Sequence, residues 1–348
     1  MSLTRNAVLL LVAALLSACA IAPQNGDSAA PEKPVFQHSI ATESKPWTHE
    51  NFDNADSKYT FALFSDITGG ERDGVYTVAI EQLRLLRPEL IVNVGDLIEG
   101  GTADRAQLTR EWNSFDQRSE RAMAPVFYTG GNHDLTNLDM WDVWEERYGQ
   151  RYYYFIYKDT LFLVLDTEDN SPEFQMELAK IRDEAIVQIE KEGWEIFNKT
   201  EYGRSTERRS GRISPEQAAY FSDVIAKNPQ VRWTFVLMHK PAWERPDEEN
   251  FSTIETALEG RPYTVFYGHV HSYLHEQRHG RDYIRLATTG GVQNASKDMA
   301  IDHVTLVTVS EEGVDIANLR MSGIFNKTGK IPAGGDKLCF EAAVCGED

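Results

Sequence analysis

Five apolar, strand-like stretches of the sequence each end in a short cluster of polar residues. The clusters are Ser65-Asp66-Ile67-Thr68, Gly95-Asp96-Leu97-Ile98-Glu99, Gly131-Asn132-His133-Asp134, His239-Lys240-Pro241 and Gly268-His269-Val270-His271. Ligands of α/β proteins bind in the crevice beyond the carboxyl ends of the strands, so these side chains are expected to meet there. They offer carboxylates, an amide and imidazoles but no thiolate, a set that suits Mn, Fe, Zn or a similar divalent metal.

Short β-rich runs alternate with polar helical stretches along the chain. Strands are expected at residues 59–64, 90–94, 125–128, 152–157, 160–166, 232–238, 264–267, 283–287 and 303–309. Helical spacing covers residues 76–86 and 105–123, and Ser214 followed by Pro215 predicts a further capped helix. Because the alternation gives way to a strand-rich C-terminal half, the pattern predicts α/β layers with two sheets in one domain.

One segment looks inserted into this pattern, at about residues 170–212. It is charged, helix-prone and only weakly apolar. Two interpretations remain open: a surface excursion that overhangs a site, or a solvated helix without that role.

The composition is that of a folded soluble protein with an acidic surface. The 348 residues are 41% hydrophobic, and 54 acidic residues against 35 basic ones give a net charge of −19. Binding to a nucleic acid requires a positively charged surface that faces the phosphate backbone, so the acidic composition excludes nucleic-acid binding as a function. An anionic substrate would require a local positive field, for which a bound metal ion is the strongest candidate.

The N-terminus reads as an export signal over residues 1–18. Arg5 precedes an apolar run that is too short to span a bilayer. The ending Leu16-Ser17-Ala18-Cys19 resembles a bacterial lipobox, which predicts lipidation of Cys19 and anchoring of a periplasmic protein to the outer membrane. The alternative is ordinary cleavage, because Ala18-Cys19-Ala20 also fits the A-x-A pattern.

Three further segments follow the signal. Residues 19–50 are predicted to be a flexible tether, residues 51–325 the folded domain and residues 326–348 a C-terminal tail. Cys339 and Cys345 lie in this tail, and export to an oxidising compartment favours a disulfide between them. The alternative is two free thiols.

Taken in order, the five clusters resemble the calcineurin-like metallophosphoesterase superfamily. The pattern of the superfamily is Asp-x-His, Gly-Asp, Gly-Asn-His-Asp/Glu, His and Gly-His-x-His, and its last four blocks are intact in this chain. The match spans residues 59–319. The resemblance implies a four-layer αββα sandwich with two mixed β-sheets and a dinuclear metal centre between them.

The resemblance also assigns metal ligands to individual residues. Asp96 would bridge two divalent ions, for which Mn, Fe or Zn are the expected identities. The other ligands would be divided between the ions, with Asp66 and His271 at the first and Asn132, His239 and His269 at the second.

The same resemblance implies hydrolysis of a phosphate ester, either a monoester or a diester. A hydroxide bridging the two ions would attack phosphorus, His133 would protonate the leaving oxygen, and Asp134 would orient the His133 ring. The substrate would be a phosphorylated small molecule or an envelope component. The alternative function is a catalytically weakened member of the fold that binds a phosphorylated ligand at the cell envelope.

The first block departs from the family pattern, because Thr68 stands where the superfamily has histidine. The purple acid phosphatase branch also lacks that histidine and uses a tyrosine three residues after the bridging aspartate. Here that position is Glu99, whose carboxylate would favour a harder ion such as Mn²⁺, Mg²⁺ or Ca²⁺ at the first site. The alternative is that Glu99 is a loop residue and that the first site is weak or empty. Lys240 and Arg72, which flank the motifs, are expected at the surface.

Overall fold

Two β-sheets form the centre of the fold in the computed structural model, which describes residues 36–52 and 58–345. The strands of the five-stranded sheet, in spatial order, are β12 (Gly313–Arg320), β11 (His303–Ser310), β2 (Tyr59–Phe64), β3 (Leu90–Asn93) and β4 (Val126–Phe127). In this sheet β2, β3 and β4 run parallel, while β11 is antiparallel to both of its neighbours. The predicted export signal and Cys19 lie outside the described residues.

The second sheet has seven strands and is mixed as well. In spatial order they are β1 (Phe36–His38), β5 (Tyr153–Tyr157), β6 (Thr160–Val164), β7 (Trp233–Leu237), β8 (Tyr263–Tyr267), β10 (Arg281–Arg285) and β9 (Leu274–Arg278). Neighbours from β6 to β10 are parallel, and both edges are antiparallel. The sequence did not reveal β1, β9 or β12.

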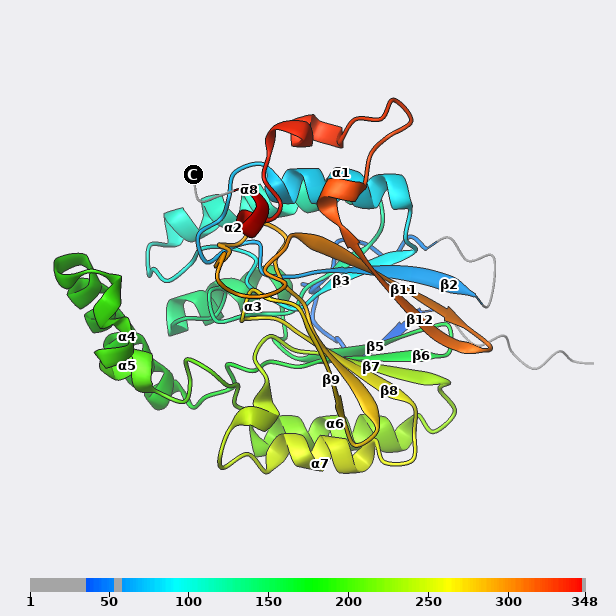
Figure 1. Cartoon of the computed structure of the whole chain (residues 1–348). Helices are drawn as coiled ribbons and strands as arrows, with labels where there is room; N and C mark the ends of the chain where they lie inside the picture. The colour runs from blue at the N-terminus through cyan, green and yellow to red at the C-terminus, as the bar shows by residue number, and fades with distance from the viewer. Residues whose placement is uncertain (1–35, 53–57, 346–348) are drawn as a thin grey trace, which may run out of the picture. The chain divides into compact units, whose positions relative to one another are not determined.

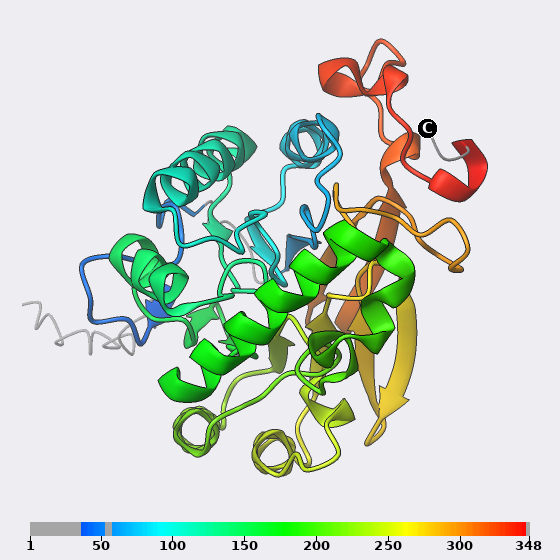
Figure 2. The same cartoon turned by 90° about the vertical axis from the view of Figure 1, so that its left-hand side faces the viewer.

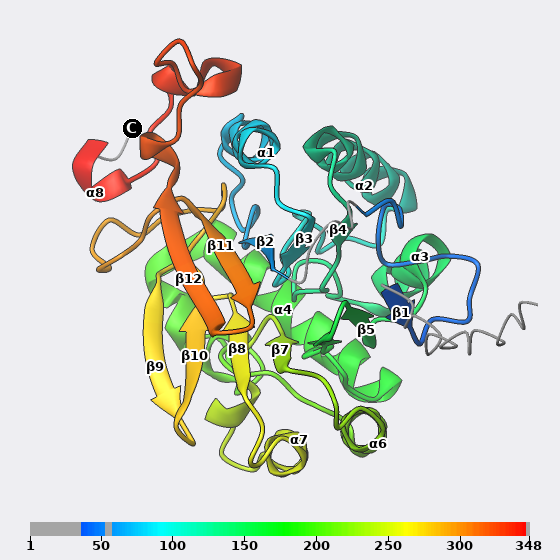
Figure 3. The ribbon, with the colours of Figure 1, turned by 90° about the vertical axis from the view of Figure 1, so that its right-hand side faces the viewer.

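Helices cover the outer faces of both sheets (Figures 1 and 3). The five-stranded sheet carries α1 (Val75–Leu86), α2 (Arg105–Ser119) and α3 (Leu138–Tyr148), and the seven-stranded sheet carries α6 (Pro215–Lys227) and α7 (Asn250–Ala257). Ser214 caps α6 by accepting a hydrogen bond from the Gln217 amide, as the sequence predicts. The predicted four-layer αββα sandwich is confirmed.

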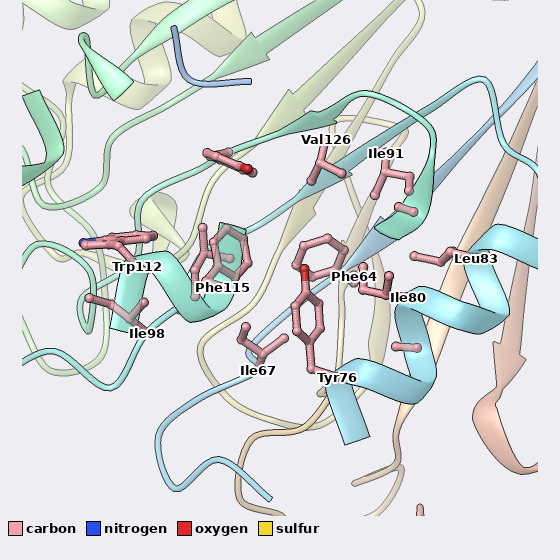
Figure 4. Close-up of a cluster of buried hydrophobic side chains, with 14 of the residues drawn as sticks. Phe64, Ile67, Tyr76, Ile80, Leu83, Ile91, Ile98, Trp112, Phe115 and Val126 are labelled. Atoms are coloured by element: carbon pink, nitrogen blue, oxygen red, sulfur yellow. The ribbon is translucent and has the colours of Figure 1, made fainter. Parts of the chain in front are cut away.

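Aromatic side chains fill the spaces between the layers. Figure 4 shows Tyr76 of α1 beside Phe64 of β2 and Phe115 of α2, with ring centroids 5.2 and 5.7 Å from that of Tyr76. Between the sheets, Phe61 of β2 packs edge-on against Phe162 of β6 at 5.1 Å. Such close contacts fix the sheets and helices relative to one another, and therefore fix the loops at the strand ends.

The predicted excursion contains α4 (Pro172–Glu192), a 3₁₀ segment (Trp194–Lys199) and α5 (Glu201–Arg204). Ser171 caps α4, with Pro172 at its first position. These helices stand beside the layers in Figure 1, and Figure 2 shows α4 lying across them.

The N-terminal boundary of the folded domain needs correction. Within the predicted tether, the described residues 36–50 are packed rather than flexible: β1 pairs with β5, and Ile40 and Trp47 are buried in the core between the sheets. The apolar residues there are too few and too irregularly spaced to stand out in the sequence.

The predicted tail is also part of the fold. A 3₁₀ segment (Pro332–Lys337) packs on α1, Phe340 is buried, and Cys339 is joined to Cys345 by a disulfide. The chain closes with the short helix α8 (Ala342–Cys345). Within the described residues, no helix combines the length and apolar character needed to cross a bilayer.

Candidate metal centre

The five polar clusters follow the carboxyl ends of β2, β3, β4, β7 and β8, and they come together in space. Ligand atoms of Asp66, Asp96 and His271 lie within 4.8 Å of one another; we call these residues the Asp66 group. Those of Asp96, His239 and His269 are equally close. Asn132 joins them, because its Oδ1 is 3.1 Å from His239 Nε2, and we call these four the His239 group. Asp96 belongs to both groups.

The three ligand histidines are each anchored through one ring nitrogen on a backbone carbonyl oxygen. The distances are 2.8 Å from His239 Nδ1 to Val94, 2.7 Å from His269 Nε2 to Arg208 and 2.6 Å from His271 Nδ1 to Val292. A carbonyl oxygen only accepts, so each of these nitrogens carries a proton and the other nitrogen can offer its lone pair. That nitrogen faces a carboxylate in two cases: Nε2 of His239 is 3.2 Å from Asp96 Oδ2, and Nε2 of His271 is 3.3 Å from Asp66 Oδ1.

This donor set fits two divalent ions. Carboxylate, amide and imidazole donors converge in two groups that share one carboxylate, and each imidazole is oriented by a second hydrogen bond, as metal-ligating histidines are. The Asp66 group contains one imidazole and the His239 group two, so the harder ion is expected at the Asp66 group.

The backbone of the centre is held in an unusual conformation. Asp66, Asp96, His269 and His271 have φ angles of 44°, 58°, 73° and 57°, in the left-handed region that non-glycine residues seldom adopt. Such strain persists only where the surrounding structure enforces it, and it is concentrated at functional sites.

Two glycines of the motifs are required because carboxylate oxygens of the candidate ligands lie very close to their Cα atoms. A Cβ on Gly131 would lie 2.3 Å from Asp96 Oδ1, and one on Gly268 would lie 2.4 Å from Asp66 Oδ2. Any side chain at either position would therefore displace a ligand carboxylate, which explains the glycine in both the Gly-Asn-His and the Gly-His-x-His blocks.

The pKa shifts of the buried side chains indicate that the centre favours a bound positive charge. Burial disfavours the charged form of Asp96, yet His239 and His133 hold the pKa of its carboxyl well below its ordinary value. Burial also opposes charging of His239, yet Asp96 raises the pKa of His239 to about 9. Burial and the neighbouring His239 keep the pKa of His269 well below its ordinary value. A cation between Asp96 and the histidines is thus favoured, and a metal ion would replace the proton.

His133 lies beside the ligands with its ring oriented by the backbone. Its Nδ1 is 2.9 Å from the carbonyl oxygen of Glu99 and 4.0 Å from Glu99 Oε2, so Nδ1 carries a proton. The opposite nitrogen, Nε2, points toward Gly69, and His133 lines the cavity over the ligands. Nε2 is therefore the atom that a bound substrate can reach.

Asp134 does not orient the His133 ring, contrary to the role that the resemblance implied. Its buried carboxylate accepts hydrogen bonds from four backbone amides, those of Asp96, Leu97, Ile98 and Gly131. Burial and the nearby Asp96 carboxylate raise the pKa of Asp134 to about 8. Asp134 therefore positions the loop that carries Asp96, and the Glu99 carbonyl orients His133.

Glu99 also lies elsewhere than proposed from the sequence. Its Oε1 accepts hydrogen bonds from the amides of Gly70 and Glu71, at 2.9 and 2.6 Å, and it belongs to neither ligand group. Burial opposes its ionisation, but the Thr68 hydroxyl, these two amides and His133 lower its pKa. Glu99 is thus the loop residue of the alternative interpretation, and it does not replace the missing histidine.

Lys240, expected at the surface, is buried next to the centre, and Arg72 is partly exposed with its guanidinium paired to a buried carboxylate. The Lys240 ammonium is buried and lies 2.8 Å from Glu168 Oε1. Arg72 Nη2 donates to both carboxylate oxygens of the buried Asp302, at 2.6 and 2.8 Å. Both side chains hold loops that flank the ligands.

A cavity of about 680 Å³ opens over the two ligand groups. Asp96, Asn132, His133, His269 and His271 lie at its base. The excursion forms its cover, through residues of α4, the 3₁₀ segment and the Arg208-Arg209 pair. The excursion thus overhangs the site. Sequence reasoning did not single out the basic side chains here, for which the adjacent Arg208-Arg209 was the only signal.

The model of the calcineurin-like phosphoesterase family matches residues 59–273, more than half of the chain. The chain belongs to the calcineurin-like phosphoesterases. It is thus a phosphoester hydrolase of a family that depends on two metal ions. Among curated protein sequences, none matches it.

Solved structures of this phosphoesterase fold resemble the chain at low sequence identity. Purple acid phosphatase PPD1 from Lupinus luteus is 14% identical with a TM-score of 0.51, and the match covers 78% of this chain and 53% of that one. A dimetal phosphatase from Danio rerio is 12% identical with a TM-score of 0.49, covering 75% of this chain and 98% of that one. The likeness to the lupin structure supports the shared fold.

Proposed function

We propose that this phosphoesterase hydrolyses phosphate monoesters or diesters with two divalent ions and with His133 as the general acid. The observation that carries the proposal is the pair of ligand groups sharing Asp96, with His133 alongside in the same cavity. The two ions, held by the Asp66 and His239 groups, would supply positive charge to the phosphoryl oxygens and activate water.

The residues of the chain have separate tasks in this reaction. Hydrolysis forms a bond from phosphorus to the water oxygen and breaks the bond to the ester oxygen, which takes up a proton. The imidazolium form of His133, protonated at both nitrogens, would donate that proton from Nε2, which faces the cavity, while the Glu99 carbonyl holds the ring through Nδ1. Asp134 keeps Asp96 in position through the backbone amides.

The proposed location is the periplasm, with the chain anchored to the outer membrane through a lipid on Cys19. The lipobox-like Leu16-Ser17-Ala18-Cys19 supports this, and the Cys339–Cys345 disulfide is typical of an oxidising compartment. Mass spectrometry of the mature N-terminal peptide tests it: an unmodified Cys19 would exclude the anchor.

The test of activity uses the purified full-length protein in detergent with added Mn²⁺. Wild type is expected to hydrolyse p-nitrophenyl phosphate or its bis ester, and His133→Ala to lower kcat roughly 10²–10⁴-fold, the usual contribution of a general acid. His275→Ala is the matched control, because this histidine is exposed on β9, away from the cavity. Asp66→Asn should lower the bound metal from two ions per chain to one.

Three results would contradict the proposal. The first is a wild-type protein that binds a phosphorylated ligand but hydrolyses neither ester with any divalent metal, which would favour the weakened binding protein. The second is full activity of His133→Ala, and the third is a single bound ion in the wild-type protein.

A further inference from the structure

The cavity over the ligand groups is lined by more basic side chains than binding one phosphoryl group requires. They form what we call the cationic set: Arg182, Arg208, Arg209, Arg285 and Lys297. Only two carboxylates, Asp96 and Glu244, line the same cavity. In a chain with a net charge of −19, this local excess of positive charge is a departure from the rest of the molecule.

The cationic set is little neutralised by acidic side chains, although the charge of Arg285 does act on the nearby Glu244. Within residues 36–52 and 58–345, none of the five forms an ion pair with a carboxylate. The Arg208 guanidinium instead lies 4.8 Å over the ring of Phe197. Burial and the neighbouring Arg209 lower the pKa of Arg208, and burial together with Arg285 and Arg208 lowers that of Lys297. The cations therefore repel one another, and an anion placed among them would relieve that repulsion.

Two members of the set are fixed to the ligand loops. The carbonyl oxygen of Arg208 accepts from His269 Nε2 at 2.7 Å, and the Lys297 ammonium donates to the carbonyl oxygen of Val270 at 3.1 Å. Val270 lies between the ligands His269 and His271. The Arg208 backbone and the Lys297 side chain are therefore placed next to the ligand groups, although Lys297 itself is exposed to solvent.

The excursion adds an apolar lining to the same cavity, from Ala185, Ile186, Ile189, Trp194 and Phe197, which we call the apolar set. Trp194 is 74% exposed, and its ring lies edge-on to that of Phe197 at 5.9 Å. Ile186 is 39% exposed. Exposed aromatic and branched side chains beside a polar site are typical of pockets that bury the apolar part of a ligand.

We propose that this cavity selects phosphate esters whose alcohol part combines an apolar body of aromatic size with a second anionic group. The phosphoryl group occupies the metal centre, the apolar body packs against the apolar set, and the second anion binds the cationic set. The inference rests on the proposed function for the place of the phosphoryl group.

The experiment compares two pairs of probes on the full-length protein loaded with Mn²⁺. Hydrolysis is measured with phenyl phosphate and 4-carboxyphenyl phosphate, and binding by calorimetry with benzylphosphonate and 4-carboxybenzylphosphonate, whose C–P bond is not hydrolysed. In wild type the carboxylate should improve both kcat/KM and Kd roughly tenfold or more, the range of a charged hydrogen bond.

Two variants remove members of the cationic set, Arg208→Gln and Lys297→Gln. Each should bring the carboxylate preference down to roughly threefold or less. Comparing the two probes within each variant cancels the chemical difference between the leaving groups. Lys180→Gln is the control, because Lys180 lies on the exposed face of α4 with its charge near Glu177, and it should keep the wild-type preference. Trp194→Ala should weaken binding of both phosphonates without altering their ratio.

The outcomes separate this proposal from the proposed function. Equal affinity of wild type for the two phosphonates, or an unchanged preference in both Arg208→Gln and Lys297→Gln, would overturn the cationic set as an anion site. If Trp194→Ala binds both phosphonates as tightly as wild type does, the apolar set does not bind the apolar body of the ligand. If the phosphonate preference is present but neither ester is hydrolysed, the cavity is as proposed and the hydrolase function fails.

Discussion

At the scale of single residues, burial controls how the ionisable side chains of this phosphoesterase behave. His303 of β11 is an example outside the metal centre: its Nε2 accepts a hydrogen bond from the Ala287 amide at 2.9 Å. Burial lowers the pKa of His303 to about 4. The ring is therefore neutral in the folded protein at pH values where it would be charged in the unfolded chain.

This difference predicts a loss of stability in acid. The folded pKa of about 4 lies below the ordinary value of 6.5, so the unfolded chain binds more protons between these values. The stabilising contribution is complete above pH 6.5 and is lost as the pH falls toward 4, by about 3 kcal/mol in total. The measurement is urea unfolding in the presence of a chelator at several pH values. As the pH falls, the free energy of unfolding should decrease less steeply in His303→Gln than in wild type.

His275→Gln serves as the control for this titration, because His275 is exposed on β9. If His303→Gln and wild type lose stability in parallel from pH 7 to pH 4, His303 does not contribute to the acid sensitivity.

Asp134 and Glu99 show what residue types alone leave undecided. An aspartate at position 134 could orient a histidine, and a glutamate at position 99 could bind a metal. In the structure, both carboxylates instead accept hydrogen bonds from backbone amides of loops. A carboxylate bonds to whichever donors the fold brings near it. The sequence places both residues at the site but cannot tell which donors surround them.

At the scale of elements, the excursion lines one side of the cavity over the candidate ligand groups. It is tied to the strand ends by Lys240, which follows β7 directly after the ligand His239. The Lys240 ammonium pairs with Glu168 and also donates to the carbonyl oxygen of Glu207, at 2.7 Å, in the last part of the excursion. One buried cation thus holds both ends of the excursion.

Breaking this pair is expected to destabilise the protein strongly. Lys240→Met leaves Glu168 buried without its partner, so the free energy of unfolding should fall by about 3–5 kcal/mol. The double variant Lys240→Met, Glu168→Leu removes both charges and should recover most of that loss, since an apolar pair avoids the desolvation cost. Urea unfolding of the two variants measures both effects. A double variant no more stable than Lys240→Met would show that the charge on Glu168 is not the cause.

At the scale of the whole molecule, the acidic chain requires cations at the site where its substrate is bound. The net charge of −19 disfavours an anionic ligand at long range. Two bound metal ions and the cationic set would together reverse this field within the cavity. The ligands also come from both sheets, from the ends of β2, β3 and β4 and of β7 and β8, so ions held between them connect the two halves of the sandwich.

Metal binding is therefore expected to stabilise the whole fold. Ions that bind the folded chain and not the unfolded one raise stability by roughly 2.7 kcal/mol at a concentration 100 times Kd. Removal of metal by EDTA should lower Tm by several degrees, and added Mn²⁺ should restore it. Asp96→Asn, which alters the carboxylate shared by both groups, should lose most of this response. A Tm that is insensitive to chelator and to Mn²⁺ would contradict binding of ions between the sheets.

The sequence by itself determined the layered fold and indicated the candidate residues of the two ligand groups. Strand-like runs that end in Asp, Asn and His predict both the sheets and the location of the candidate ligands, because the end of a strand fixes where the next residues lie. The tertiary structure decided the rest: the docking of residues 36–50, the roles of Asp134 and Glu99, and the place of the excursion over the ligands. These features depend on contacts between residues that are far apart in the chain, and local sequence patterns do not predict such contacts. The cationic side chains of the excursion are one such case, since they lie beside the candidate ligand groups only in the folded protein.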